Sequence, residues 1–151
     1  VMVEYSSFTC GFCGRFHRET LPQVKQNYVD SGDVAFVYKH FLRNSEDARI
    51  ANHAECAGEQ EQFFEFVDLV FQNQQDMGDS TLQSHAESLG LDMGEYNSCV
   101  ESGRNSEIAN AHYEEARANG VTGTPTFFIN GEKVVGAQPY SVFSSALDQA
   151  Q

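Results

Sequence analysis

Two cysteines separated by two residues stand where the chain changes from a strand pattern to a helix pattern. The opening residues, VMVEY, are rich in Val and Tyr and predict a buried strand over 1–6. From Cys10 to about residue 31 the apolar residues recur at helical spacing, which puts Cys10 and Cys13 at the start of a helix. A pair of this kind is a redox dithiol, part of a metal site or a short structural disulfide. The rest of the chain has to decide among these three.

The remaining pattern gives an order of elements. Pro22 lies inside the first predicted helix and should kink it, because proline lacks an amide donor and clashes with the preceding turn. A second strand is predicted over 34–41. Around Asn130 and Gly131, two apolar runs predict a hairpin, since a tight turn needs two residues with positive φ. A last helix begins at or just after Pro139, and five helices are expected before the hairpin, at about 45–60, 61–74, 80–89, 92–102 and 105–119.

This order, β-α-β followed by a helical block and then β-β-α, predicts an α/β fold. A right-handed β-α-β crossover followed by an antiparallel hairpin gives a mixed sheet with helices on both faces. We therefore expect a thioredoxin-like mixed β-sheet with an all-helical insertion between the second and third strands. The expected thioredoxin-like domain is discontinuous, over 1–44 and 120–151, and the inserted helical subdomain covers 45–119.

Charge and hydropathy exclude several classes of protein. The chain has 22 Asp and Glu against 9 Lys and Arg, a formal charge of −13. This balance argues against nucleic acid and anionic membrane surfaces as partners, because phosphate binding needs clustered cations. No apolar run is long enough to span a membrane. The first residues also lack a signal peptide, so we expect a trimmed chain whose leader, and with it any membrane tether, is missing.

The position of the cysteine pair predicts different roles for its two sulfurs. A thiol at the amino end of a helix lies beside unpaired amides and the positive end of the helix dipole, which favour the thiolate. The pKa of Cys10 should therefore fall to roughly 3.5–7. Cys13 lies nearly one turn later and is more shielded. We expect Cys10 to be the exposed nucleophile and Cys13 the resolving thiol that closes on it.

A metal site is the main alternative from the residues alone. Cys10, Cys13 and His17 have spacing suitable for zinc or copper ligands. A closed structural site needs a fourth ligand, however, and no second cysteine pair or nearby histidine pair supplies one. We therefore predict no bound metal and interpret His17 as a histidine on the helix surface. A binding domain with a vestigial dithiol is a third possibility.

The chain resembles the DsbA-like thiol:disulfide oxidoreductases of the thioredoxin superfamily over nearly its whole length. The resemblance rests on CxxC at the first helix start, the helical insertion, GVTGTPTFFING near the end and GAQPY before the last helix. It implies that Pro125 is cis and faces the dithiol. It also implies that Thr124 and Pro125, with Gly11 and Phe12, bind an extended substrate strand.

The resemblance extends to residues outside the motif. Glu4 stands in an otherwise apolar strand, where the family often has a buried acid, and is a candidate proton relay for Cys13. Some family members join the two remaining cysteines, and we predict a Cys56–Cys99 structural disulfide. Closing a loop of about 44 residues would stabilise the chain by about 4 kcal/mol.

These implications define the expected function. We expect an extracytoplasmic enzyme, periplasmic or in a similar space, that donates the Cys10–Cys13 disulfide to reduced secreted polypeptides. A membrane quinone-linked thiol oxidase would re-oxidise it, no cofactor is needed, and the chain should be a monomer. The best-known relatives carry Pro-His where this chain has Gly11 and Phe12. A disulfide reductase or isomerase therefore stays open, as does a metal-handling module using Cys10, Cys13 and His17.

Overall fold

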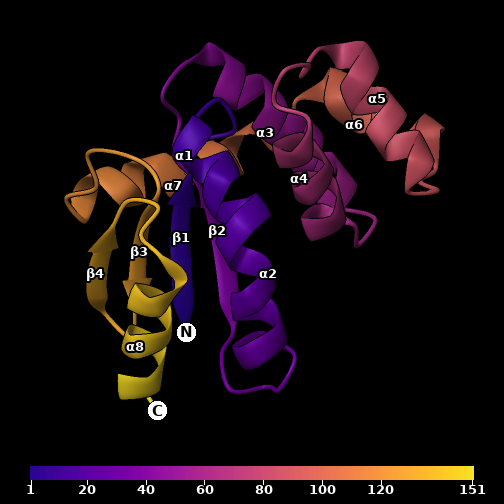
Figure 1. Ribbon diagram of the computed structural model, residues 1–151. Coiled ribbons are helices and arrows are strands. Elements are labelled where there is room, and N and C mark those ends of the chain that lie inside the picture. Colours follow the sequence, from indigo (N-terminus) through magenta and orange to yellow (C-terminus); the bar gives the residue numbers. More distant parts are fainter.

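A four-stranded mixed sheet forms the centre of the computed structural model, which describes residues 1–151 (Figure 1). The strands follow the order β2-β1-β3-β4. β1 runs parallel to β2 and antiparallel to β3, and β3 runs antiparallel to β4. The four strands are β1 Met2–Ser6, β2 Phe36–His40, β3 Thr126–Ile129 and β4 Glu132–Val135. The predicted fold class, with helices inserted between the second and third strands, is confirmed.

Helical residues from Gly11 to Val29 connect the two parallel strands, and we call them the first helical segment. It comprises α1 Gly11–Arg15, the π-helical turn η1 Phe16–Thr20, α2 Leu21–Val24 and a second π-helical turn η2 Lys25–Val29. A π-helical turn, η1, precedes Pro22, and in it the amide of Leu21 donates to the carbonyl of Phe16; the kink expected at Pro22 stays a prediction. A π-turn inserts one extra residue and so shifts the faces of the helix that follows. It begins three residues after Cys13.

Five helices separate β2 from β3. They are α3 Ser45–Gly58, α4 Phe63–Gln72, α5 Asp79–Ser88, α6 Met93–Ser102 and α7 Ser106–Ala118. Each begins and ends within about two residues of its expected range, because Asn and Asp caps and positive-φ glycines mark the ends of several of them in the sequence. None of the helices in the chain has the length and hydrophobicity needed to cross a membrane.

The hairpin and the last helix complete the sheet. Asn130 and Gly131 have φ values of 51° and 87°, the left-handed conformation that their two-residue turn requires. Helix α8 (Tyr140–Gln149) then packs on the same face of the sheet as the first helical segment, while α7 covers the other face (Figure 1).

The alternation of side chains along β1 decides what lies beneath the dithiol. Met2 packs with the core under the first helical segment, whereas Tyr5 packs against α7. Because side chains alternate between the faces of a strand, Glu4 shares the face of Met2. A carboxylate is thereby directed into the interior below the first helical segment. Glu4 has no exposed surface.

Candidate active site

The loop after β1 holds Cys10 at the amino end of α1. Cys10 has an extended backbone, with φ −88° and ψ 120°, and is the N-cap of α1. Its Sγ accepts a hydrogen bond from the amide of Cys13 at 3.3 Å. A cap residue normally accepts with an oxygen, so the sulfur here occupies the position that best stabilises negative charge at a helix terminus.

The other side of Cys10 faces the loop before β3. The Thr124–Pro125 peptide bond is cis, as the resemblance implies. The Cys10 Sγ lies 3.5 Å from the carbonyl oxygen of Thr124, to which it can donate only when Cys10 is protonated. The Cys10 sulfur therefore lies beside the Thr124–Pro125 bond, as expected.

Cys10 is less exposed than expected. Only 5% of its surface is accessible, because Cys13 and Thr124 cover the sulfur. It opens instead into a cavity of about 680 Å³ whose lining includes Gly11, Phe12, Arg43 and Thr124. Phe12 stands at this cavity with 62% of its surface exposed. A reacting partner would reach Cys10 through the cavity.

The two thiols of the pair have opposite acidity. A hydrogen bond with the Cys13 side chain lowers the pKa of Cys10 to about 5, and the Thr124 side chain, the Cys13 amide and the charge of Arg43 act in the same direction, against burial. Burial raises the pKa of Cys13, and its hydrogen bond to Cys10 and the charge of Glu4 raise it further. At neutral pH Cys10 is a thiolate and Cys13 a thiol. Both are free of disulfide bonds.

Glu4 has a partner that the sequence analysis missed. Its Oε1 lies 2.7 Å from the Nε2 of His17, and the two side chains are 0% and 1% exposed. The interpretation of His17 as a surface histidine is therefore wrong. His17 follows Cys13 by four residues, so both lie on the buried face of the first helical segment. That spacing from a buried cysteine is the signal that the sequence offered.

The same contact involves one of the three residues of the metal-handling alternative. His17 is bonded to Glu4 instead of joining Cys10 and Cys13, and no group of three or more His, Cys, Asp or Glu side chains in the chain is arranged to hold a metal ion.

Two further residues that position the pair come from distant parts of the chain. Asp47 of α3, 1% exposed, accepts hydrogen bonds from the Ser7 hydroxyl at 2.7 Å and from the Thr9 amide at 3.0 Å. Gln74 Nε2 donates to the carbonyls of Phe8 and Cys10, both at 2.9 Å. The helical insertion thus fixes the loop that carries Cys10.

Gly14 follows Cys13, and its lack of a side chain leaves room for Gln74 to bond the two carbonyls. A Cβ atom at Gly14 would lie 2.0 Å from the Gln74 side-chain oxygen, far inside contact distance. A larger residue would displace Gln74 from the two carbonyls that it bonds. No sequence pattern announces this pairing, since 60 residues separate the two positions along the chain.

The second cysteine pair lies within the insertion. Cys56 of α3 and Cys99 of α6 form a disulfide, and each is 1% exposed. The bond connects two helices in the same 19-residue apolar cluster that contains Cys10 and Cys13. It therefore joins elements of the insertion to each other.

Comparison with known proteins agrees with this architecture. The family model described as Thioredoxin matches residues 1–149. A Rickettsia felis protein named as a protein-disulfide oxidoreductase is 31% identical over 157 residues, which cover 99% of this chain and 56% of the relative. The chain thus spans little more than half the length of such curated relatives.

Solved structures show the same fold. Alpha-DsbA1 from Wolbachia pipientis superposes with a TM-score of 0.87 at 26% identity, covering 99% of this chain and 84% of that one. BdbD from Bacillus subtilis, in its oxidised form, gives a TM-score of 0.89 at 16% identity, covering 99% and 85%. The family match, the fold and the geometry of the cysteine pair lead to one assignment. The chain belongs to the thioredoxin family and is a DsbA-like member of it.

Proposed function

We propose that this chain is a protein-disulfide oxidoreductase that donates a Cys10–Cys13 disulfide to reduced polypeptides outside the cytoplasm. The observation that carries the proposal is the difference in acidity within the pair. The pKa of Cys10 is lowered to about 5, and that of Cys13 is raised. A thiol of low pKa is a good leaving group, and a stabilised thiolate favours the reduced enzyme. Both properties make the disulfide form an oxidant.

The reaction follows from these two thiols. A client thiolate attacks the Cys10 sulfur of the enzyme disulfide and expels Cys13, which takes up a proton. A second client thiolate then attacks the client sulfur of the mixed disulfide and expels Cys10 as a thiolate. The client leaves with a new disulfide and the enzyme is left as a dithiol. Re-oxidation reverses the electron flow through the same two sulfurs.

The residues around Cys10 would bind the client. The cavity at Cys10 combines the exposed ring of Phe12 with the backbone of Gly11 and Thr124. An extended client segment can pair with the backbone at Thr124 and Pro125 while its cysteine meets Cys10. Glu4, buried below the pair, would exchange the proton of Cys13. We further propose that residues 45–119 act as a subdomain inserted into a thioredoxin-like domain formed by 1–44 and 120–151.

The cellular setting is part of the proposal. Disulfides such as Cys56–Cys99 persist in oxidising compartments, which favours the periplasm or a similar space. The clients would be reduced secreted polypeptides, and a membrane quinone-linked thiol oxidase would re-oxidise the pair. We propose a monomer that uses no cofactor, and no role in binding nucleic acid.

Equilibration with glutathione buffers tests the direction of the reaction. We expect a reduction potential closer to the −120 mV of strong oxidants than to the −270 mV of thioredoxin, both approximate. Because Cys10 stays ionised, one proton accompanies two electrons, and the potential should fall by about 30 mV per pH unit between pH 6 and 8. A potential near that of thioredoxin would instead assign the chain to a reductase or isomerase role.

A further inference from the structure

Arginines gather around Cys10 in a chain that is otherwise strongly acidic. The sequence has 9 Lys and Arg against 22 Asp and Glu, a formal charge of −13. Three of the basic residues line the cavity at Cys10, namely Arg15, Arg18 and Arg43, whereas Glu19 is the only carboxylate in that lining. The sign of the charge is therefore reversed where a client would approach.

Two of the three arginines keep a charge that no carboxylate neutralises. Arg15 lies 3.1 Å from the Glu19 carboxylate, so these two charges offset each other. Arg18 donates to a backbone carbonyl of α4 at 2.8 Å and to the Gln74 side-chain oxygen at 3.1 Å, and both acceptors are neutral. No salt bridge in the chain includes Arg18 or Arg43. The net charge of the lining comes from these two residues.

Hydrogen bonds hold Arg18 and Arg43 in fixed positions relative to Cys10. Gln74, which accepts from Arg18, also donates to the carbonyl of Cys10 at 2.9 Å. Asp47 accepts from the amide of Arg43 at 2.9 Å and from the amide of the residue before Cys10 at 3.0 Å. The charge of Arg43 also lowers the pKa of Cys10, so it acts on this sulfur. Both arginines thus belong to the surroundings of the reacting atom.

Unpaired guanidinium groups at a reaction site favour an anionic partner, because they bind carboxylates with charge-assisted hydrogen bonds. A client already brings one negative charge, since its attacking group is a thiolate. A carboxylate beside the client cysteine would bring a second one. In water such a carboxylate raises the pKa of the client thiol and lowers the fraction of thiolate. Beside Arg18 and Arg43 this disadvantage is offset.

The size of the cavity limits where the client carboxylate can stand. The cavity has a volume of about 680 Å³. It spans roughly three residues of extended chain at about 3.3 Å each, so the carboxylate must lie within about two residues of the reacting cysteine. Phe12, 62% exposed at the same cavity, offers an apolar surface to the rest of the segment. A polypeptide segment can make both contacts.

We propose that Arg18 and Arg43 make this chain select client segments that carry Asp or Glu within about two residues of the reacting cysteine. This inference rests on the proposed function and adds a substrate class to it. The arginines form no covalent bond and leave the exchange unchanged, since the client thiolate still attacks Cys10 and expels Cys13. They are specificity-determining residues.

Three short dithiol peptides that differ only in the residues beside their cysteines test this selection. The flanking residues are Asp, Asn or Lys, and the oxidant is the disulfide form of the intact chain. At about 0.15 M salt the Debye length is about 8 Å, so distant carboxylates of the chain are screened more than the arginines of the lining. Each rate constant is divided by that of the same peptide with neutral hydroxyethyl disulfide, which cancels differences in thiol pKa.

The corrected rates distinguish the inference from the proposed function. We expect the Asp peptide to react roughly tenfold faster than the Lys peptide, with the Asn peptide between them. This preference should fall towards unity at about 1 M salt, where screening is strong. Equal corrected rates for the three peptides would overturn the inference and leave the proposed function standing. Failure to oxidise any of the peptides would contradict the proposed function, and the inference with it.

Substitutions of the two arginines test which charges carry the preference. Arg43→Gln should reduce the ratio of the Asp rate to the Lys rate by roughly threefold, since one of two exposed cations is lost. The double variant Arg18→Gln/Arg43→Gln should bring the ratio close to unity. Any change in the pKa of Cys10 affects all three peptides alike and cancels in the ratio. A ratio that survives in the double variant would contradict the assignment.

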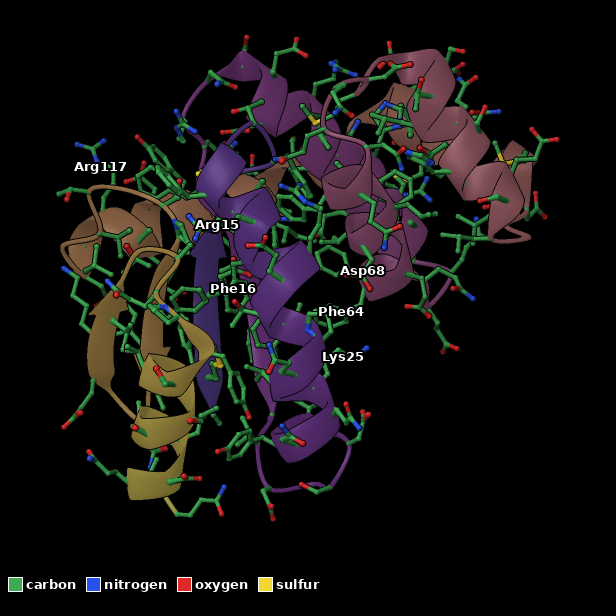
Figure 2. All side chains as sticks on the ribbon, viewed as in Figure 1. Arg15, Phe16, Lys25, Phe64, Asp68 and Arg117 are labelled. Atoms are coloured by element: carbon green, nitrogen blue, oxygen red, sulfur yellow. A yellow bond between two sulfur atoms is a disulfide. The ribbon has the colours of Figure 1, made fainter.

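Arg117→Gln is the matched control, because it makes the same charge change outside the cavity lining. Arg117 packs over the ring of Tyr113 on α7. Figure 2 shows it extending from α7 away from α1, which carries Arg15. We expect the ratio of the Asp rate to the Lys rate to stay at its wild-type value in this variant. Equal losses in Arg43→Gln and Arg117→Gln would assign the preference to net charge and overturn the inference.

Discussion

The two cysteine pairs of this chain have nearly the same burial and opposite chemistry. Cys13, Cys56 and Cys99 are at most 1% exposed, and Cys10 is only 5% exposed. Yet Cys56 and Cys99 are bonded to each other, whereas Cys10 and Cys13 are free and differ widely in pKa. Exposure therefore does not separate a structural from a reactive sulfur here.

What separates the pairs is the set of groups that face each sulfur. Cys10 receives the Cys13 amide at a helix end and stands beside Thr124, while Arg43 adds positive charge. The Cys13 thiol is buried, and the negative charge of the Glu4 carboxylate raises its pKa further. Cys56 and Cys99 face each other from α3 and α6. Two sulfurs within one helical turn thus have pKa values shifted in opposite directions, because different groups face them.

Replacing the nucleophile should have the largest effect on activity. Cys10→Ser removes the only sulfur that we assign to client attack, so oxidation of a reduced client should fall to the uncatalysed rate. Cys13→Ser is the matched control. Its Cys10 thiolate should attack the disulfide of an oxidised client, expel one client sulfur as a thiolate and accumulate as the mixed disulfide, because the resolving thiol is missing. If Cys10→Ser still oxidised the client faster than the uncatalysed rate, Cys10–Cys13 could no longer be called the reactive pair and Cys56–Cys99 the structural one.

Removing the other pair should affect stability and not chemistry. The disulfide closes a loop with a sequence separation of 43. The double variant Cys56→Ala/Cys99→Ala should lose about 4 kcal/mol of unfolding free energy in the chain-entropy model, measured by urea denaturation. The pKa of Cys10 should be unaltered. A shifted Cys10 pKa would mean that the two pairs are coupled through their common apolar cluster.

The pH dependence of the unfolding free energy tests the buried ion pair of His17 and Glu4. Folding raises the pKa of His17 from about 6.5 to about 9, so its contribution is fully present below pH 6.5 and is lost as the pH rises through 9. The shift corresponds to roughly 3 kcal/mol. The stability difference between the reduced wild type and His17→Gln should narrow by this amount between pH 6 and 9.5. Titration of Cys10 occurs in both proteins and cancels, and a difference independent of pH would count against the ion pair.

The smallest expected effect is on the pKa of Cys10 and distinguishes the contributions of two nearby arginines. Arg43→Ala should raise the pKa of Cys10 by less than about one unit, because Arg43 is the weakest of the groups that lower it. Arg15 lines the same cavity but is paired with Glu19 at 3.1 Å. Arg15→Ala should therefore leave the Cys10 pKa in place, as measured by thiolate absorbance. Equal shifts in the two variants would mean that general charge, and not position, acts on the sulfur.

The elements that carry local signals could be predicted from the sequence. The strand before Cys10, the turn at Asn130 and Gly131 and the amphipathic helices all follow from short-range patterns, and the order of these elements fixes the mixed sheet. The resemblance adds the cis bond at Pro125 and the pairing of Cys56 with Cys99. Each of these features depends on residues close in sequence or on the family likeness.

Contacts between distant residues could not be predicted. Asp47 and Gln74 hold the loop before Cys10 from the insertion, and single polar residues in helices or loops give no sign of such a role. Glu4 meets His17 only because β1 lies beneath the first helical segment. The π-turn before Pro22 could not be predicted either, because this backbone pattern has no residue signature in the sequence. It interrupts the single helix that the sequence predicted.

The acidity of Cys10 is the measurement on which the account depends most directly. Thiolate absorbance of the reduced protein, followed from pH 3 to 10 with Cys10→Ser as the blank, reports this group alone, because the pKa of Cys13 is raised beyond the range. The account predicts a midpoint near pH 5. A midpoint near 8.5, the value of an ordinary cysteine, would contradict it.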